Sequence, residues 1–145
     1  MVTRFLLDVN LIVAMHLPGS ESFTRVQRWF TEVGSRNFAT CAITQAGFVR
    51  VCTQLAVKDR AIDITEAKAS LLRLTAFSGH AYWPMDISYL DATEPFEVRM
   101  QGYRQITDAF LLGLAIHHRG KLATLDRAIV HLAGPEFTDH VELIS

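Results

Sequence analysis

The chain has 145 residues, of which half are hydrophobic and a fifth charged, a composition that predicts one folded domain and excludes intrinsic disorder. Its net charge of −1 lacks the excess of basic residues typical of a general nucleic-acid-binding protein. It leaves room for an enzyme whose bound metal and local arginines neutralise the substrate. Asp8 interrupts the apolar N-terminal stretch, so we expect neither a signal peptide nor a membrane span. With only Cys41 and Cys52, we expect two buried thiols in a reducing cytoplasm rather than a disulfide framework.

The first part of the chain is predicted to fold as a strand followed by two helices. A short buried strand is expected over residues 3–7, and Asn10 is expected to cap a helix that runs to Met15. A second helix is expected to open at Ser20 or Ser22. Its apolar residues recur at helical spacing and are Phe23, Val26, Trp29, Phe30 and Val33.

The middle of the chain continues the alternation. A strand is expected over residues 38–41, and Thr44 is expected to cap a helix. The apolar residues of that helix are Phe48, Val49, Val51, Cys52, Leu55 and Ala56. Another helix is expected to start at Thr65 and to bury Leu71, Leu72, Leu74 and Phe77. Residues 80–84 are predicted to form a third strand that ends at a proline.

The last part of the chain contains the most apolar segment. A helix is expected from residue 88 to about residue 100, although Pro95 leaves its limits open. Residues 109–116 are apolar almost all round, which is typical of a buried helix. Strands are expected at residues 121–124 and 141–144. Strands that alternate with helices predict right-handed crossovers, and therefore a three-layer α/β/α sandwich with a central, mainly parallel sheet of four or five strands. No linker or repeat divides residues 1–145, so we expect a single domain.

Three acids are expected to lie at one edge of this sheet. Ligands bind at the carboxyl ends of parallel strands, and Asp8 and Asp126 directly follow the strands at residues 3–7 and 121–124. Asp108 opens the apolar helix. Clustered carboxylates repel one another unless a cation or a shared proton neutralises them, and oxygen ligands favour Mg²⁺ or Mn²⁺. Each acid also has a simpler interpretation, since Asp8 and Asp108 can cap helices and Asp126 can belong to a turn.

Four short motifs, in order along the chain, resemble those of PIN-domain ribonucleases. They are Leu6-Leu7-Asp8-Val9-Asn10, Thr44-Gln45-Ala46-Gly47-Phe48-Val49-Arg50, Ile106-Thr107-Asp108-Ala109 and Leu122-Ala123-Thr124-Leu125-Asp126-Arg127. Within that family, the chain resembles the VapC-type toxins of bacterial type II toxin–antitoxin systems. The resemblance implies a PIN-like fold and a Mg²⁺-dependent endoribonuclease, with Mn²⁺ as a substitute ion. It also implies a homodimer in the cytoplasm that is neutralised by a cognate VapB-type antitoxin.

The resemblance assigns roles to the matched positions. Asp8, Asp108 and Asp126 match the acidic cluster that binds the metal, and Asn10 matches a polar residue that supports the first acid. Thr124 matches the polar residue that often precedes the last acid, and we expect it, like Arg50, to contact substrate. The expected chemistry is hydrolysis of RNA phosphodiesters by metal-activated water. A surface ion pair is the alternative use of Arg50.

One position departs from the family pattern. Where the family usually has a glutamate on the helix at Thr44, this chain has Gln45, and that helix carries no other acid. The cluster therefore has less negative charge, which favours one metal ion over two. A catalytically weak or inactive module that binds RNA or a protein partner remains the alternative function.

Other enzyme classes and other metal ligands are less well supported. An aspartyl-nucleophile phosphotransferase generally needs a second acid two residues after the first, where this chain has Asn10. Adjacent residues of a helix point in different directions, so we do not expect His117 and His118 to chelate a metal as a pair. The apolar residues around Phe23, Trp29 and Phe30 are candidates for antitoxin contact, with core packing as the alternative.

Overall fold

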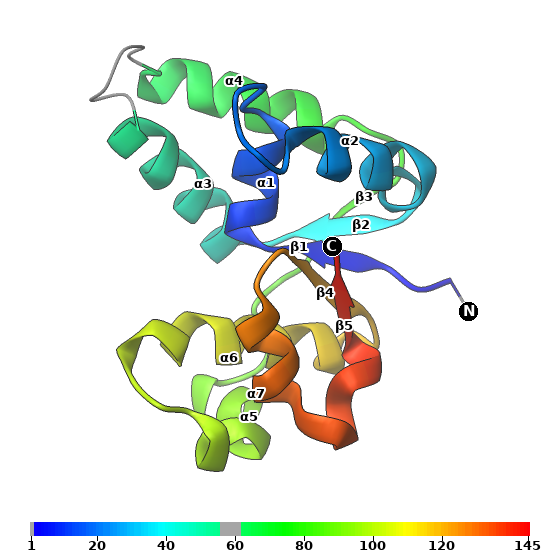
Figure 1. The fold of residues 1–145 in the computed structure, drawn as a ribbon, viewed down its shortest axis with the longest axis vertical. Coiled ribbons are helices and arrows are strands. Elements are labelled where there is room, and N and C mark those ends of the chain that lie inside the picture. Colours follow the sequence, from blue (N-terminus) through cyan, green and yellow to red (C-terminus); the bar gives the residue numbers. More distant parts are fainter. Residues whose placement is uncertain (1, 56–61) are drawn as a thin grey trace.

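The computed structural model describes residues 2–55 and 62–145 and shows three layers (Figure 1). A sheet of five parallel strands has the order β3-β2-β1-β4-β5. Helices α1 to α4 cover one face, and α5 to α7 cover the other. The predicted α/β sandwich with a parallel sheet is therefore confirmed. Within the described residues, no helix is both long and apolar enough to span a membrane.

The strands are short, as expected for a sheet buried on both faces. They are β1 (Phe5–Leu7), β2 (Phe38–Thr40), β3 (His80–Tyr82), β4 (Lys121–Thr124) and β5 (Val141–Leu143). The α-helices are α1 (Val9–Met15), α2 (Phe23–Glu32), α3 (Ala42–Leu55), α4 (Ile64–Thr75), α5 (Tyr89–Thr93), α6 (Ile106–His117) and α7 (Arg127–Phe137). Short 3₁₀ helices are η1 (Gly34–Arg36), η2 (Glu94–Arg99), η3 (Tyr103–Gln105) and η4 (Thr138–His140). The predicted helical position Ala56 lies outside the described residues.

Alternate residues of the strands point to opposite faces of the sheet and fill two apolar cores. In β1, Leu6 belongs to the core under α5–α7, whereas Leu7 belongs to the core under α1–α4. The register pairs Leu6 with Leu122 of β4, and both side chains are fully buried on the same face. Because a one-residue slip would turn these side chains to the wrong layer, the apolar pattern fixes the register. That register places the ends of β1 and β4 side by side.

Several helices begin at residues other than those predicted. The N-cap of α1 is Asp8, not Asn10: Asp8 leaves β1 in an extended conformation, and its side chain accepts a hydrogen bond from the Val9 amide. Helix α3 begins at Ala42, so Thr44 lies in its first turn, where its hydroxyl bonds both backbone groups of Cys41. In each case the chain starts the helix as soon as it leaves the strand.

Helix α4 also differs from the prediction. Its N-cap is Asp63, whose carboxylate accepts from the Glu66 amide at 2.8 Å, so the helix starts before Thr65. Leu74 is buried, but Leu72 is 72% exposed and the prediction that it is buried is wrong. Because each helical residue turns by about 100°, Leu72 and Leu74 point about 200° apart, and a helix that packs on one side cannot bury both.

The segment between β3 and β5 shows two further differences. The predicted helix from residue 88 to 100 is a single α-helical stretch, α5, followed by the 3₁₀ helix η2, which contains Pro95. Helix α7 was not predicted. Its apolar residues precede a kink at Gly134, which has a φ of +67°, and Pro135 follows at once. Cys41 and Cys52 are both buried thiols, as predicted.

Candidate active site at the carboxyl edge of the sheet

Asp8 is a buried carboxylate at the end of β1, only 5% exposed. Its Oδ1 accepts from the Val9 amide at 2.8 Å, and its Oδ2 accepts from the Thr124 hydroxyl at 2.7 Å. Burial raises the pKa of Asp8, while these two hydrogen bonds act in the opposite direction and lower it. Asp8 thus caps α1 and belongs to a buried polar network at the same time.

Thr124 and Asp126 are positioned by the end of the neighbouring strand β4. The Thr124 hydroxyl, which donates to Asp8, also accepts from the Asp126 amide at 3.0 Å. Asp126 caps α7 through a hydrogen bond that Oδ1 accepts from the Ala128 amide at 2.9 Å. Thr124 is fully buried, and its hydroxyl faces Asp8 and Asp126 rather than the surface where we expected it to contact substrate. It holds two acids in place.

Asp108 approaches the same edge from the first turn of α6. Its pKa is raised to about 7, first by burial and then by the negative charges of Asp8 and Asp126. The charge of Asp126 likewise raises the pKa of Asp8. The three acids that are far apart in sequence are therefore electrostatic neighbours in the fold. Because the three carboxylates repel one another, a bound cation or a proton would stabilise this group of acids.

The carboxylates are grouped loosely. Among the described residues, the only trio of histidine, cysteine or acidic ligand atoms within 4.8 Å of one another is Asp86, His117 and His118. The oxygens of Asp8, Asp108 and Asp126 are thus spread more widely than that. A divalent cation that keeps several waters binds directly to only one or two carboxylates, so loosely grouped acids still fit such an ion.

A pocket of about 520 Å³ opens onto two of these acids, Asp108 and Asp126. The loop before α6 forms most of the remaining wall, with Tyr103 80% exposed and Arg104 at 5.9 Å from its ring centroid. An exposed aromatic ring and a guanidinium beside carboxylates can stack on a base and meet a phosphate. In sequence alone Arg104 is one of several basic residues that could contact RNA, because nothing in its immediate neighbours shows that η3 borders the pocket.

The other predicted residues are placed around this edge. Arg50 is exposed on α3 and lines a separate pocket with Val9 and Thr107, which are the chain neighbours of Asp8 and Asp108. Asn10 is exposed in the first turn of α1. Gln45 is half-buried, and its amide nitrogen donates to the Thr40 hydroxyl at 3.0 Å.

The hydrogen bond of Gln45 continues into a short polar chain. The Thr40 hydroxyl is also 2.7 Å from Nε2 of His80. Burial and the charge of Arg4 lower the pKa of His80, which favours its neutral form. At the position where the family usually has a glutamate, this chain therefore has an uncharged network that joins α3 to the last residue of β2 and the first residue of β3.

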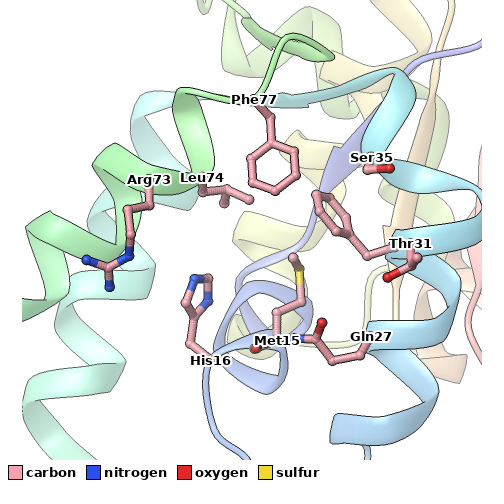
Figure 2. Close-up of a pocket in the computed structure, with 9 residues that line it drawn as sticks. Met15, His16, Gln27, Thr31, Ser35, Arg73, Leu74 and Phe77 are labelled. Carbon is pink, nitrogen blue, oxygen red and sulfur yellow. Dashed lines mark hydrogen bonds between the residues drawn. The ribbon is translucent and has the colours of Figure 1, made fainter.

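A second hollow, of about 370 Å³, lies between α1, α2 and α4 (Figure 2). Its apolar side chains include Met15, Leu74 and Phe77, and Arg73 points along its rim. Phe30, one of the residues considered for antitoxin contact, is 6% exposed and packs edge-on against Phe38.

Trp29, the second of those residues, also serves the core. Its ring packs edge-on against Phe5 at 5.3 Å between centroids, and its indole nitrogen donates to Glu142. Core packing is thus the main role of the predicted apolar stripe on α2.

The chain matches known proteins over nearly its whole length. Residues 5–135 match the PIN domain family. The chain is 40% identical to Ribonuclease VapC38 of Mycobacterium tuberculosis over 140 residues, which is 97% of each protein. Its fold is similar to VapBC2 from Rickettsia felis, solved bound to a DNA fragment from their promoter, with a TM-score of 0.67, 11% identity and coverage of 99% and 100% of the two chains.

A second structural neighbour is Mycobacterium tuberculosis VapC20, described as a sarcin–ricin loop cleaving toxin, with a TM-score of 0.64 and 13% identity. That similarity covers 90% of this chain and 95% of VapC20. The chain therefore belongs to the PIN-domain family and, within it, to the VapC group.

Proposed function

We propose that this protein is a metal-dependent endoribonuclease that acts as the toxin of a toxin–antitoxin pair. The observation that carries the proposal is the grouping of Asp8, Asp108 and Asp126 at one sheet edge, where burial and the charges of Asp8 and Asp126 raise the pKa of Asp108 to about 7. The names of its VapC relatives support RNA as the substrate.

The residues at this edge fit a hard divalent cation, for which we propose Mg²⁺, with Mn²⁺ as a substitute. Asp8, Asp108 and Asp126 would hold it, since they supply oxygen ligands without histidine or cysteine. When bound, such an ion supplies positive charge that stabilises a phosphodiester as it is cleaved and makes a water molecule more acidic. The burial and mutual repulsion of the acids favour uptake of that positive charge.

The protein's own groups would position the substrate and the acids. The Thr124 hydroxyl fixes Asp8 and Asp126 relative to each other through its two hydrogen bonds. Tyr103 and Arg104 line the pocket that opens onto Asp108 and Asp126, and Arg50 lines a separate pocket with Val9 and Thr107. These side chains would bind the phosphates and bases of RNA. With Gln45 committed to Thr40, three carboxylates rather than four carry the negative charge, so we propose that one ion suffices for turnover.

Cleavage of RNA by the purified protein, with Mg²⁺ or with EDTA, tests the proposal. We expect products only with Mg²⁺, and none from Asp108→Asn. Asp139→Asn is the matched control, because Asp139 is exposed on η4, away from the cluster. Tight RNA binding without products would instead support a binding module, and cleavage that persists in Asp108→Asn would refute the assigned site.

We also propose that the protein is a homodimer and that its partner is a VapB-type antitoxin. Solved complexes named VapBC2 and FitAB among its structural neighbours support a partner of this kind. The hollow beside α4 suits an apolar segment carrying an acidic group, because Arg73 lies at its rim. Arg73→Glu should weaken capture of the antitoxin encoded next to this gene while RNA cleavage is unchanged. Equal capture would refute this surface, and a monomer by light scattering would refute the dimer.

A further inference from the structure

Three side chains with metal-ligand chemistry converge at the far end of α6. His117 is the last residue of that helix, His118 is its C-cap, and Asp86 lies in the loop after β3. Asp86 Oδ1 is 3.3 Å from His117 Nε2 and 3.1 Å from His118 Nε2. The expectation that the two rings point apart is therefore wrong. His118 is the C-cap, with φ −88° and ψ 8°, and the Nε2 atoms of both rings approach the same oxygen of Asp86.

The spacing of these atoms matches the coordination shell of a small cation. Zinc binds imidazole nitrogen and carboxylate oxygen at about 2.0–2.1 Å in a tetrahedral arrangement, which puts ligand atoms about 3.3 Å apart. The two measured distances from Asp86 Oδ1 are close to this value, and all three ligand atoms lie within 4.8 Å of one another. An ion could enter with small side-chain movements.

The surroundings hold the site in place. The His118 ring stacks on Trp83, with ring centroids 4.5 Å apart and planes at 15°, and Trp83 is only 6% exposed. The carbonyl oxygen of Pro84 is 3.2 Å from His118 Nε2, so it adds an oxygen beside the same nitrogen. The carboxyl end of a helix also carries partial negative charge, which favours a cation at His117 and His118.

The site is separate from the acid cluster in position and in chemistry. Asp108 and His117 are nine positions apart on α6, which is about 14 Å along a helix axis at 1.5 Å per residue. Two imidazole nitrogens suit zinc, whereas oxygen-only ligands suit magnesium. We propose that Asp86, His117 and His118 form a Zn²⁺ site whose fourth position is open to water, and that the bound ion ties the loop after β3 to the end of α6.

Zinc titration by calorimetry tests the site on the full chain without an affinity tag. The protein is stripped of metal and then held in excess Mg²⁺, which occupies oxygen ligands and leaves imidazoles free. We expect one equivalent of Zn²⁺ to bind and to raise the melting temperature. Asp86→Asn and His117→Gln should each weaken this binding at least tenfold, since even changes outside the direct ligands of a metal cost tenfold or more.

Two matched controls keep the result specific. His131→Gln removes an exposed histidine on α7, and Asp108→Asn removes an acid from the cluster; both should bind Zn²⁺ like the unaltered chain. The proposal is overturned if the unaltered chain binds no Zn²⁺ in Mg²⁺. It is also overturned if binding survives in both Asp86→Asn and His117→Gln, or is lost in Asp108→Asn. Because RNA cleavage is measured in Mg²⁺ alone, failure of the zinc site leaves the nuclease proposal standing.

Discussion

Replacing Asp108 by asparagine should stabilise the metal-free protein, and should do so increasingly as the pH rises. The folded-state pKa of Asp108 is raised from 3.8 to about 7, so folding favours its protonated form. The stability that this preference contributes is complete below pH 3.8 and is lost as the pH rises through about 7. Asparagine resembles the protonated acid and does not titrate, so the variant keeps this contribution at every pH.

The size of the effect follows from the raised pKa. At about 1.4 kcal/mol per unit, a pKa of about 7 in place of 3.8 corresponds to about 4 kcal/mol as an upper limit. Asp108 is only half-buried, and solvent screening reduces this to about 1–2 kcal/mol. Between pH 5 and pH 8.5 we expect Asp108→Asn to gain about 1 kcal/mol in free energy of unfolding relative to the unaltered chain, because this window covers about two of the three pH units between 3.8 and 7.

Urea denaturation in EDTA at several pH values measures the difference directly. The same urea denaturation is repeated with Mg²⁺ in place of EDTA. Mg²⁺ should stabilise the unaltered chain at pH 8 and have a smaller effect on Asp108→Asn. Asp139→Asn, with its exposed side chain, should show neither effect. A difference between Asp108→Asn and the unaltered chain that stays constant across this pH range would refute the reasoning that burial and charge repulsion raise the pKa of Asp108.

Three more substitutions test how the site is held. Thr124→Val removes the hydroxyl that donates to the Asp8 carboxylate and accepts from the Asp126 amide. Urea denaturation should show a loss of about 1–3 kcal/mol and RNA cleavage should fall, whereas Thr124→Ser should retain both stability and cleavage. A Thr124→Val variant with unchanged stability would contradict the network. Arg50→Ala should weaken RNA binding and lower its salt dependence in filter-binding assays, with Arg50→Lys intermediate; unchanged binding would leave Arg50 as a surface residue. Gly47→Ala places a Cβ 2.6 Å from a Val9 methyl group, so thermal denaturation should show a loss of about 1–3 kcal/mol in stability. Gly19→Ala, with nothing within 4 Å of the new Cβ, should leave stability almost unchanged. Equal effects of the two substitutions would show that α1 and α3 can shift apart freely.

The sheet and its order of elements were predictable because they depend on local patterns. Short apolar strands that alternate with helices leave few topologies besides a parallel sheet. The precise starts of helices were less predictable. Asp8 and Asn10 are both good N-caps, and only the turn at the end of β1 decides between them.

Elements shaped by long-range contacts were harder to predict. Helix α7 ends its regular course at Gly134, where a Cβ would lie 2.5 Å from the guanidinium carbon of Arg99. The positive φ of +67° explains a glycine inside the segment, and the glycine and Pro135 hide the helix from a periodicity search. The pairing of Asp86 with His117 and His118 is likewise invisible in sequence, because it depends on where the loop after β3 returns to α6.

Helix capping and metal binding need not be alternative roles for the acids. Asp8 caps α1 and Asp126 caps α7, each through one carboxylate oxygen. A carboxylate has about four acceptor positions, so each acid retains the capacity to bind a cation after these hydrogen bonds are made. The caps also fix each side chain on a rigid element, and Thr124 joins the two. The capping role that made Asp8 look like an ordinary N-cap, and that Asp126 shares, is therefore the one that prepares both acids to hold an ion.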